Sequence, residues 1–154
     1  LNISRFDMAE TVKEIINRFA VYQHRDGYVI TSECDERAWV EADELKISQV
    51  IYNLIGNAVN YTGEDKTVHI AVKVQDGKVR FSVSDSGEGI AKEEIDRVWE
   101  RYYKSSQRHK RAAVGTGIGL SIVKNILLLH HAKFGVNSKV HEGSTFWFVL
   151  NEAK

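Results

Sequence analysis

The chain has no proline and only one cysteine, Cys34, in its 154 residues. A single cysteine cannot close an internal disulfide and cannot by itself build a zinc site, which excludes the small domains stabilised by either. Proline and stretches rich in glycine or serine usually mark linkers, and the sequence has no such stretch. We therefore expect one domain over residues 1–154, a length at which one hydrophobic core is normal.

The sequence has no excess of positive or negative charge, because 21 Lys and Arg residues balance 21 Asp and Glu residues. The overall charge therefore predicts no nucleic-acid partner. No apolar run approaches the roughly 18 residues that cross a bilayer as a helix, and no signal-peptide pattern is present at the start. The sequence begins directly in a pattern typical of folded structure, so we expect it to be part of a longer protein.

Apolar periodicity predicts an α+β fold. Helical spacing is present from Asp7 to about Phe19, from Asp43 to Tyr61 and from Gly117 to His130, and Asp7 and Asp43 are suitable N-caps. Alternation predicts strands at Tyr28–Glu33, Ala38–Glu41, Thr67–Val74, Lys78–Val83, Lys133–Ser138 and Ser144–Leu150. The hairpin at 67–83 favours a mixed, largely antiparallel sheet, so the prediction is a two-layer α/β sandwich with about three helices on one face.

Three asparagines, Asn53, Asn57 and Asn60, form a polar stripe on the helix predicted for 43–61. Such a stripe is normally a solvated face. Asparagine, however, is a poor helix former because its side chain competes for backbone hydrogen bonds. A carboxamide oxygen is also a neutral, hard ligand, suited to a Mg²⁺ ion that keeps water and phosphate oxygens. Both interpretations remain open on this evidence.

A second motif, Asp85-Ser86-Gly87-Glu88-Gly89-Ile90, follows an alternating strand. Asp, Ser and Gly are the usual residues of a plain turn. Alternatively, Gly87 and Gly89 let the backbone approach a flat ligand, and Asp85 accepts a hydrogen bond from the exocyclic amine of adenine. Guanine has a carbonyl at that position, so the same carboxylate would reject it.

A glycine-rich stretch, Gly115 to Leu120, opens the last predicted helix. Backbone N–H groups at such a turn can bind anions, although the spacing fits neither the Walker loop nor the dinucleotide fingerprint. A flexible loop is the alternative. The preceding residues, 91–114, are basic and contain several aromatics. They suit a mobile lid over a triphosphate, an ordinary solvated loop or, less well given the neutral net charge, a nucleic-acid contact.

Together and in this order, the motifs resemble those of the catalytic and ATP-binding domain of bacterial sensor histidine kinases. These belong to the Bergerat-fold superfamily shared with gyrase, Hsp90 and MutL. The resemblance covers essentially the whole chain. The matching boxes are Asn53–Ala58, Asp85–Ile90, Trp99–Lys104, Gly115–Leu120 and Gly143–Phe146.

The resemblance implies ATP and Mg²⁺ as cofactors. Asn57 would be the magnesium ligand, with Asn53 helping to hold metal and phosphates. Tyr61 would flank the adenine, and Asp85 would read its amine with help from the hydroxyl of Thr145. Residues 91–114 would be the ATP lid. Lys104 would reach the terminal phosphate, and the other implied pocket residues are Gly87, Gly89, Ile90, Tyr103, Gly115, Thr116, Gly117, Gly119 and Leu120.

The resemblance also implies partners. The family's phosphoacceptor histidine lies in a separate dimerisation segment, followed by an acidic residue and a proline, so this chain would lack it. It would transfer the γ-phosphoryl of Mg-ATP to that histidine, which then serves a response regulator. The full-length protein would be a homodimer and the isolated domain a monomer. We expect a cytoplasmic domain of a membrane-anchored sensor.

Some residues depart from the family pattern. Asn60 stands where the family often has a basic residue that contacts phosphate, which leaves open a degenerate ATP-sensing or docking module without transfer activity. Trp99 and Tyr102 replace the usual phenylalanines. Superfamily members that hydrolyse ATP or phosphorylate serine have a Glu at the position of Asn53. Because asparagine cannot act as a general base, an ATPase or an anti-sigma-type serine kinase is the weaker alternative.

Overall fold

The computed structural model describes residues 1–100 and 119–154. Five residues that the resemblance places in the pocket lie outside these ranges: Tyr103, Lys104, Gly115, Thr116 and Gly117. The described elements are, in chain order, β1 (Ile3–Asp7), α1 (Met8–Arg18), α2 (Ala20–Asp26), β2 (Val29–Cys34), β3 (Trp39–Asp43), α3 (Glu44–Tyr61), β4 (Thr67–Gln75), β5 (Lys78–Asp85), the 3-10 helix η1 (Lys92–Arg97), α4 (Leu120–Leu129), β6 (Lys133–Lys139) and β7 (Gly143–Asn151).

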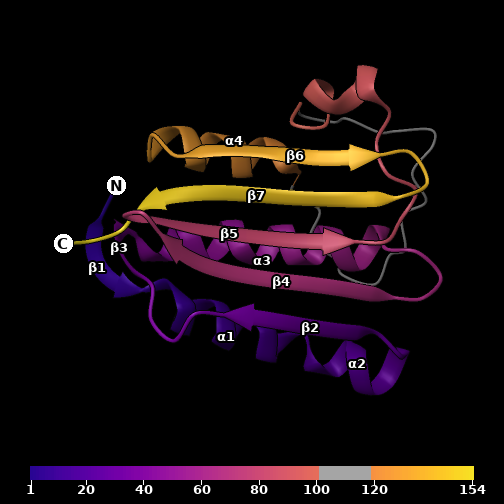
Figure 1. The fold of residues 1–154 in the computed structure, drawn as a ribbon, viewed down its shortest axis with the longest axis horizontal. Coiled ribbons are helices and arrows are strands. Elements are labelled where there is room, and N and C mark those ends of the chain that lie inside the picture. The colour runs from indigo at the N-terminus through magenta and orange to yellow at the C-terminus, as the bar shows by residue number, and fades with distance from the viewer. Residues whose placement is uncertain (101–118) are drawn as a thin grey trace.

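The main sheet has five strands in the order β2-β4-β5-β7-β6. Only β2 and β4 run parallel, and the other neighbours are antiparallel. Figure 1 shows α1, α3 and α4 behind this sheet as a second layer. The predicted two-layer α/β sandwich with a mixed, largely antiparallel sheet is therefore confirmed. No described helix is long and apolar enough to cross a membrane.

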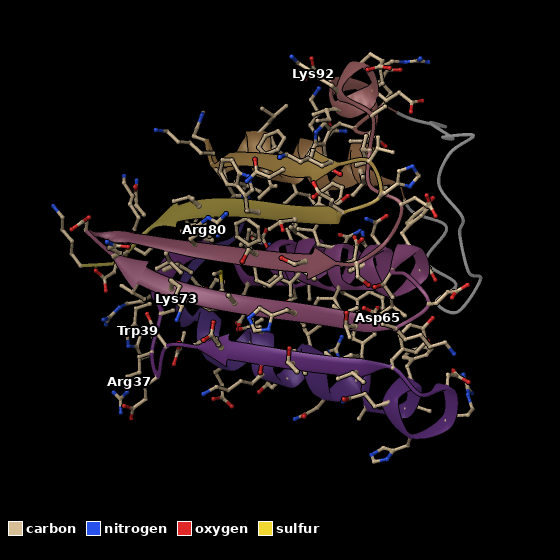
Figure 2. All side chains as sticks on the ribbon, turned by 45° about the vertical axis from the view of Figure 1, so that its right-hand side comes forward. Arg37, Trp39, Asp65, Lys73, Arg80 and Lys92 are labelled. Carbon is tan, nitrogen blue, oxygen red and sulfur yellow. The ribbon has the colours of Figure 1, made fainter. Side chains whose placement is uncertain are left out.

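The face of the sheet away from these helices is more polar. Lys73 on β4 and Arg80 on β5 are exposed and pair across the two strands (Figure 2). Their neighbours along the strands, Val72 and Phe81, are fully buried on the helix side. This alternation is what a sheet covered on one face requires.

Two aspartates begin the longer helices, as predicted. The Asp7 carboxylate accepts a hydrogen bond from the Ala9 N–H at 3.1 Å, and the Asp43 carboxylate accepts one from the Lys46 N–H at 3.2 Å. Asp7 also accepts one from the Ala38 N–H at 2.8 Å, just before β3. Each cap satisfies a donor that the first helical turn leaves free.

Two elements near the start of the chain differ from the sequence-based prediction. The first, β1, pairs only with β3 in a separate two-stranded antiparallel sheet. Because β3 lies more than 30 residues further along the chain, the sequence around β1 does not by itself predict a strand there. The second, α2, follows α1 directly after Phe19, whose backbone N–H closes the end of α1. It ends at Gly27 in the left-handed region (φ 76°), which glycine adopts readily.

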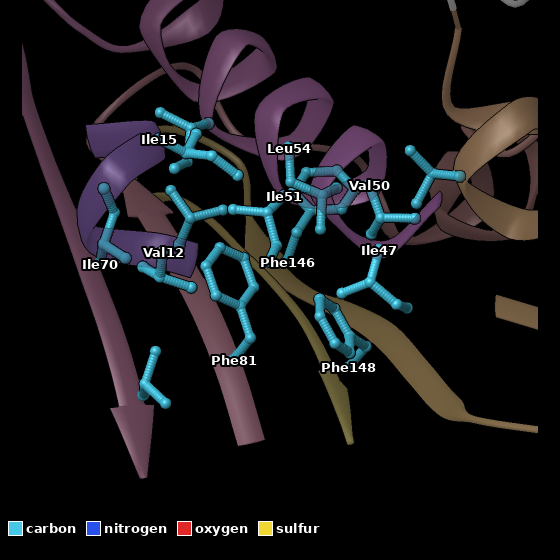
Figure 3. Packing of buried hydrophobic residues seen from close by; sticks show 14 of the residues in the cluster. Val12, Ile15, Ile47, Val50, Ile51, Leu54, Ile70, Phe81, Phe146 and Phe148 are labelled. Carbon is cyan, nitrogen blue, oxygen red and sulfur yellow. The ribbon is translucent and has the colours of Figure 1, made fainter. Parts of the chain in front are cut away.

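One hydrophobic cluster fills the space between the helices and the sheet (Figure 3). The rings of Phe81 on β5 and Phe148 on β7 stack at 5.3 Å between their centroids. Val12 of α1 and Ile51 of α3 are fully buried in the same cluster. Phe6 and Val40 contribute from β1 and β3, so both sheets share this core.

The beginning of the segment expected to be a lid contains buried residues. Val98 and Trp99 are buried, and the Trp99 ring meets Phe134 and Phe146 edge to face at 5.2 and 5.5 Å. Ile95 also packs against the core. These residues are spaced so that one face of the segment is apolar, which anchors it on β6 and β7. The remainder of the expected lid, 101–114, lies outside the described residues.

Candidate functional site

Three chain segments meet at one end of the main sheet. β5 ends at Asp85, which pairs in register with Ser144 near the start of β7. The turn after Asp85 also lies against the end of α3. Figure 1 shows this end of the sheet opposite the end where the two termini lie. The asparagine helix and the aspartate turn, far apart in sequence, are therefore neighbours in the fold.

The Asp85 carboxylate is buried (9% exposed) and held by its own turn. Its Oδ1 atom accepts a hydrogen bond from the Gly87 N–H at 2.9 Å. Residues alternate between the two faces of a strand, so Asp85 lies on the helix side of the sheet with Val83 and Phe81. This places an acceptor at the junction of β5, α3 and β7.

Two glycines allow the Asp85 turn to lie close to neighbouring backbone. A Cβ atom on Gly87 would lie 2.1 Å from the Tyr61 carbonyl oxygen, and one on Gly89 would lie 2.0 Å from that of Lys139. Gly89 also has a φ of 75°. These glycines let the turn approach the backbone of α3 and of the β6–β7 turn. Their approach to a flat ligand stays a prediction.

The far side of the turn is fixed by serines. The Ile90 N–H donates to the Ser138 hydroxyl at 2.8 Å, and this hydroxyl lies 2.7 Å from that of Ser144. Ile90 itself is 1% exposed. The turn is therefore held between α3 on one side and the β6–β7 turn on the other.

Thr145 is not brought to Asp85. Its hydroxyl lies 2.7 Å from that of Ser84, on the opposite face of the sheet. The residue opposite Asp85 is Ser144, which is 3% exposed. The alternation along β7, where Phe146 and Phe148 point into the core, indicates that Ser144 shares their side and Thr145 does not. Ser144, which the sequence analysis did not single out, therefore shares the face of Asp85, and its hydroxyl lies 2.7 Å from that of Ser138.

The asparagine stripe on α3 is not a solvated face. Asn53 and Asn60 are 6% and 1% exposed. The Nδ2 atoms of Asn53 and Asn57 are buried, and neither has a hydrogen-bond partner among the described residues. A buried donor without a partner costs about 1–3 kcal/mol. These two amides are thus suited to an external acceptor.

α4 packs against α3 and runs in the opposite direction. The Asp43 N–H donates to His130 Nε2 at 3.1 Å, so the end of α4 lies beside the start of α3. α4 has 10 residues and α3 has 18, so the start of α4 lies toward the middle of α3. Gly119, the N-cap of α4, makes no side-chain cap, and Leu120 packs against the core.

A metal would have few acidic or histidine ligands here. Within residues 1–100 and 119–154, no group of three or more His, Cys, Asp or Glu side chains could hold a metal ion. A cation at this end of the sheet would depend on amide oxygen and on oxygens of a ligand, which is a donor set that Mg²⁺ accepts.

Comparison with known proteins identifies the family. Residues 42–154 match the family described as histidine kinase-, DNA gyrase B- and HSP90-like ATPases. The chain is 31% identical over 151 residues to the sensor-like histidine kinase SenX3 of Mycolicibacterium smegmatis, covering 98% of this chain and 39% of that protein. The chain thus spans about two fifths of the length of this curated relative.

Solved structures are also similar. The nucleotide-free catalytic domain of histidine kinase ThkA superposes with a TM-score of 0.84 at 26% identity, covering all of both chains. ThkA has also been solved with the response regulator protein TrrA. Full-length ShkA in complex with AMPPNP gives a TM-score of 0.84 at 27% identity, over 99% of this chain and 32% of that one. The chain therefore belongs to the histidine kinase-, DNA gyrase B- and HSP90-like ATPase family, as the ATP-binding catalytic domain of a sensor histidine kinase.

Proposed function

We propose that this domain binds Mg-ATP at the carboxyl end of β5 and donates the γ-phosphoryl group to a histidine on a separate dimerisation domain. The observation that carries the proposal is the pair of buried amide donors on Asn53 and Asn57 of α3, which have no partner among the described residues. An acceptor-rich triphosphate would satisfy both donors. The AMPPNP complex of ShkA, a similar structure with an ATP analogue, supports this choice of ligand.

Each described residue has a distinct task in this proposal. Asp85 accepts a hydrogen bond from the adenine amine, and Ser144, its partner in the strand register, is the proposed assisting hydroxyl. Tyr61 flanks the base, with Gly87 and Ile90 shaping the turn. Asn53 donates to phosphate oxygens, and the backbone N–H groups that begin α4 after Gly119 do the same. Asn57 would hold Mg²⁺ through its amide oxygen and donate its amide N–H to a phosphate oxygen, and the ion would supply charge neutralisation for the transfer.

Phosphoryl transfer needs positioning and charge neutralisation more than covalent chemistry from the protein. Asn53 has no basic lone pair at its amide nitrogen, so it cannot activate water or a serine hydroxyl. This favours transfer to a nucleophilic histidine over ATP hydrolysis. The acceptor domain, a response regulator and a membrane-anchored cytoplasmic setting belong to the proposed full-length kinase. The sensor kinase SenX3 and the ThkA–TrrA pair support these partners.

The proposal is tested by calorimetry and by transfer in trans. ATP is titrated into the wild type, Asp85→Asn and Asn57→Ala, each with and without Mg²⁺. We expect the wild type to bind ATP more tightly with Mg²⁺ and to phosphorylate an added dimerisation domain. Asp85→Asn should bind at least about tenfold more weakly, because an amide can turn a donor toward the adenine amine. Asn57→Ala should lose the Mg²⁺ response.

Each failure points to a different conclusion. Unchanged ATP affinity in Asp85→Asn would remove the assigned pocket. An intact Mg²⁺ response in Asn57→Ala would remove this residue as the metal ligand. Binding without transfer to any dimerisation domain would favour the ATP-sensing or docking module that the replacement at Asn60 leaves open.

A further inference from the structure

A group of hydroxyl and carboxylate side chains joins the loop after α3 to the turn that carries Asp85. Its members, here called the hydroxyl cluster, are Thr62, Asp65, Thr67 and Ser86. The Ser86 hydroxyl donates to Asp65 Oδ1, which also accepts hydrogen bonds from the Thr67 hydroxyl and N–H, both at 3.1 Å. The Ser86 N–H donates to the Thr62 hydroxyl oxygen at 3.1 Å. Ser86 is thus held through both its side chain and its backbone.

The loop that carries Asp65 is itself anchored. Lys66 adopts a φ of 54°, in the left-handed region that is uncommon for non-glycine residues. Its ammonium group donates to the Asp26 carbonyl at 2.7 Å and lies 5.3 Å from the centre of the Tyr28 ring. The Thr62 hydroxyl also donates to the Thr67 carbonyl at 2.6 Å, which closes the loop on itself. Asp65, labelled in Figure 2, is therefore a fixed support, although its side chain is exposed.

This support acts on the residue next to Asp85. Asp85 Oδ1 is held by the Gly87 N–H, so the direction of the carboxylate follows the backbone of residues 85–87. Ser86 lies in the middle of that stretch. A hydrogen bond weakens steeply when its angle departs from linearity, so a tilt of this backbone would change what the Asp85 carboxylate can recognise.

We propose that Asp65 is a positioning residue for base recognition, which fixes the Asp85 carboxylate through Ser86 so that the pocket distinguishes adenine from guanine. Asp65 lies outside the five motif boxes and does not contact the base in this scheme. The inference rests on the proposed function. Without Asp65, the hydrogen bond from the adenine amine to Asp85 weakens. The repulsion between the Asp85 carboxylate and the guanine carbonyl oxygen also decreases, because the carboxylate can turn away.

The test compares Asp65→Ala with Glu64→Ala. Glu64 is the adjacent exposed carboxylate on the same loop, so its removal makes the same change in charge without touching Ser86. Dissociation constants for ATP are measured by calorimetry, and those for GTP by competition. We expect the preference for ATP over GTP to fall by about fivefold to tenfold in Asp65→Ala. It should stay within about twofold of the wild type in Glu64→Ala.

Ser86 provides the second arm of the test. Ser86→Ala should lower the preference for ATP over GTP by the same factor as Asp65→Ala. Ser86→Thr keeps the hydroxyl and should keep the preference of the wild type. A merely structural role would weaken ATP and GTP together and leave their ratio unchanged, which would overturn the inference. A wild type that prefers ATP, together with Asp65→Ala and Ser86→Ala that keep that preference, would overturn it as well. A wild type with no preference for ATP would instead refute the proposed function.

If Asp65→Ala fails to fold by circular dichroism, the comparison of Ser86→Ala with Ser86→Thr decides alone. Loss of the preference in the first and its retention in the second supports the inference. Equal behaviour of the two variants contradicts it.

Discussion

Asp43 connects three parts of the molecule. One carboxylate oxygen accepts a hydrogen bond from the Asn2 N–H at 3.0 Å, and the other caps α3 at Lys46. Its own N–H donates to His130 at the end of α4. The hydrogen bond from Asn2 is the main cause that lowers the pKa of Asp43, followed by the one from Lys46. The ionised form is therefore favoured in the folded state.

This pKa shift predicts a dependence of stability on pH. A carboxylate with a lowered pKa in the folded state stabilises fully above its unfolded value of about 3.9. That contribution is lost as the pH falls below this value and through the folded pKa. We expect the free energy of unfolding, measured with urea at several pH values, to fall less steeply below about pH 4 in Asp43→Asn than in the wild type. Parallel curves for the two proteins would contradict the assignment.

The role of a residue can be predicted from the sequence when its partners are close along the chain, and not when they are distant. The caps at Asp7 and Asp43 depend on side chains and N–H groups two or three residues apart, so the sequence alone predicts them. The motif alone assigns Thr145 to the pocket, whereas the side of the sheet that it faces depends on the register with β5. The alternation of Phe146 and Phe148 contains that information, and it favours Ser144.

At the scale of elements, the contact between α3 and the Asp85 turn depends on Gly87. A Cβ atom there would meet the Tyr61 carbonyl oxygen at 2.1 Å, and backbone cannot give way as a flexible side chain can. We expect Gly87→Ala to separate the turn from α3, destabilise the fold by about 1–3 kcal/mol and weaken ATP binding. Thermal unfolding and calorimetry measure the two effects.

Gly77→Ala is the matched control for that prediction. Gly77 has a φ of 74°, but a Cβ atom added there would meet no other atom within 4 Å, and the residue lies in the β4–β5 turn away from Asp85. Its substitution should cost about 1 kcal/mol of stability through backbone strain alone and leave ATP affinity unchanged. Equal losses of ATP affinity in the two variants would show that contact with α3 is not the cause.

The elements that the sequence does not predict are those whose partners are distant or whose length is short. β1 has five residues and gains its partner only when β3 is folded. By contrast, α3 and the β4–β5 hairpin have strong local periodicity, which predicts them nearly to their ends. The sequence analysis also did not separate Ile95, Val98 and Trp99, which pack against the core, from the charged residues around them. The bounds of the lid stay a prediction.

For the whole molecule, the shared core predicts that truncating a buried side chain in the middle of the main sheet lowers the free energy of unfolding strongly. Phe81 is fully buried between the helices and β7. We expect Phe81→Ala to lower the free energy of unfolding by about 3–5 kcal/mol, as measured by urea denaturation. Leu45→Ala, at a position 83% exposed on α3, should change it by less than about 0.5 kcal/mol. Similar values for both variants would contradict the assigned core.

Both ends of the chain lie on β3. β1 pairs with β3 from Ile3 to Asp7, and near the other end the Ala153 N–H donates to the Trp39 carbonyl at 2.8 Å. Figure 1 shows the N and C ends close together, at the end of the sheet away from Asp85. A short peptide could join them, and new ends could be opened in a turn elsewhere. Such a circular permutant would keep every strand register and the same arrangement of α3, β5 and β7, because proximity in space rather than order along the chain assembles the pocket.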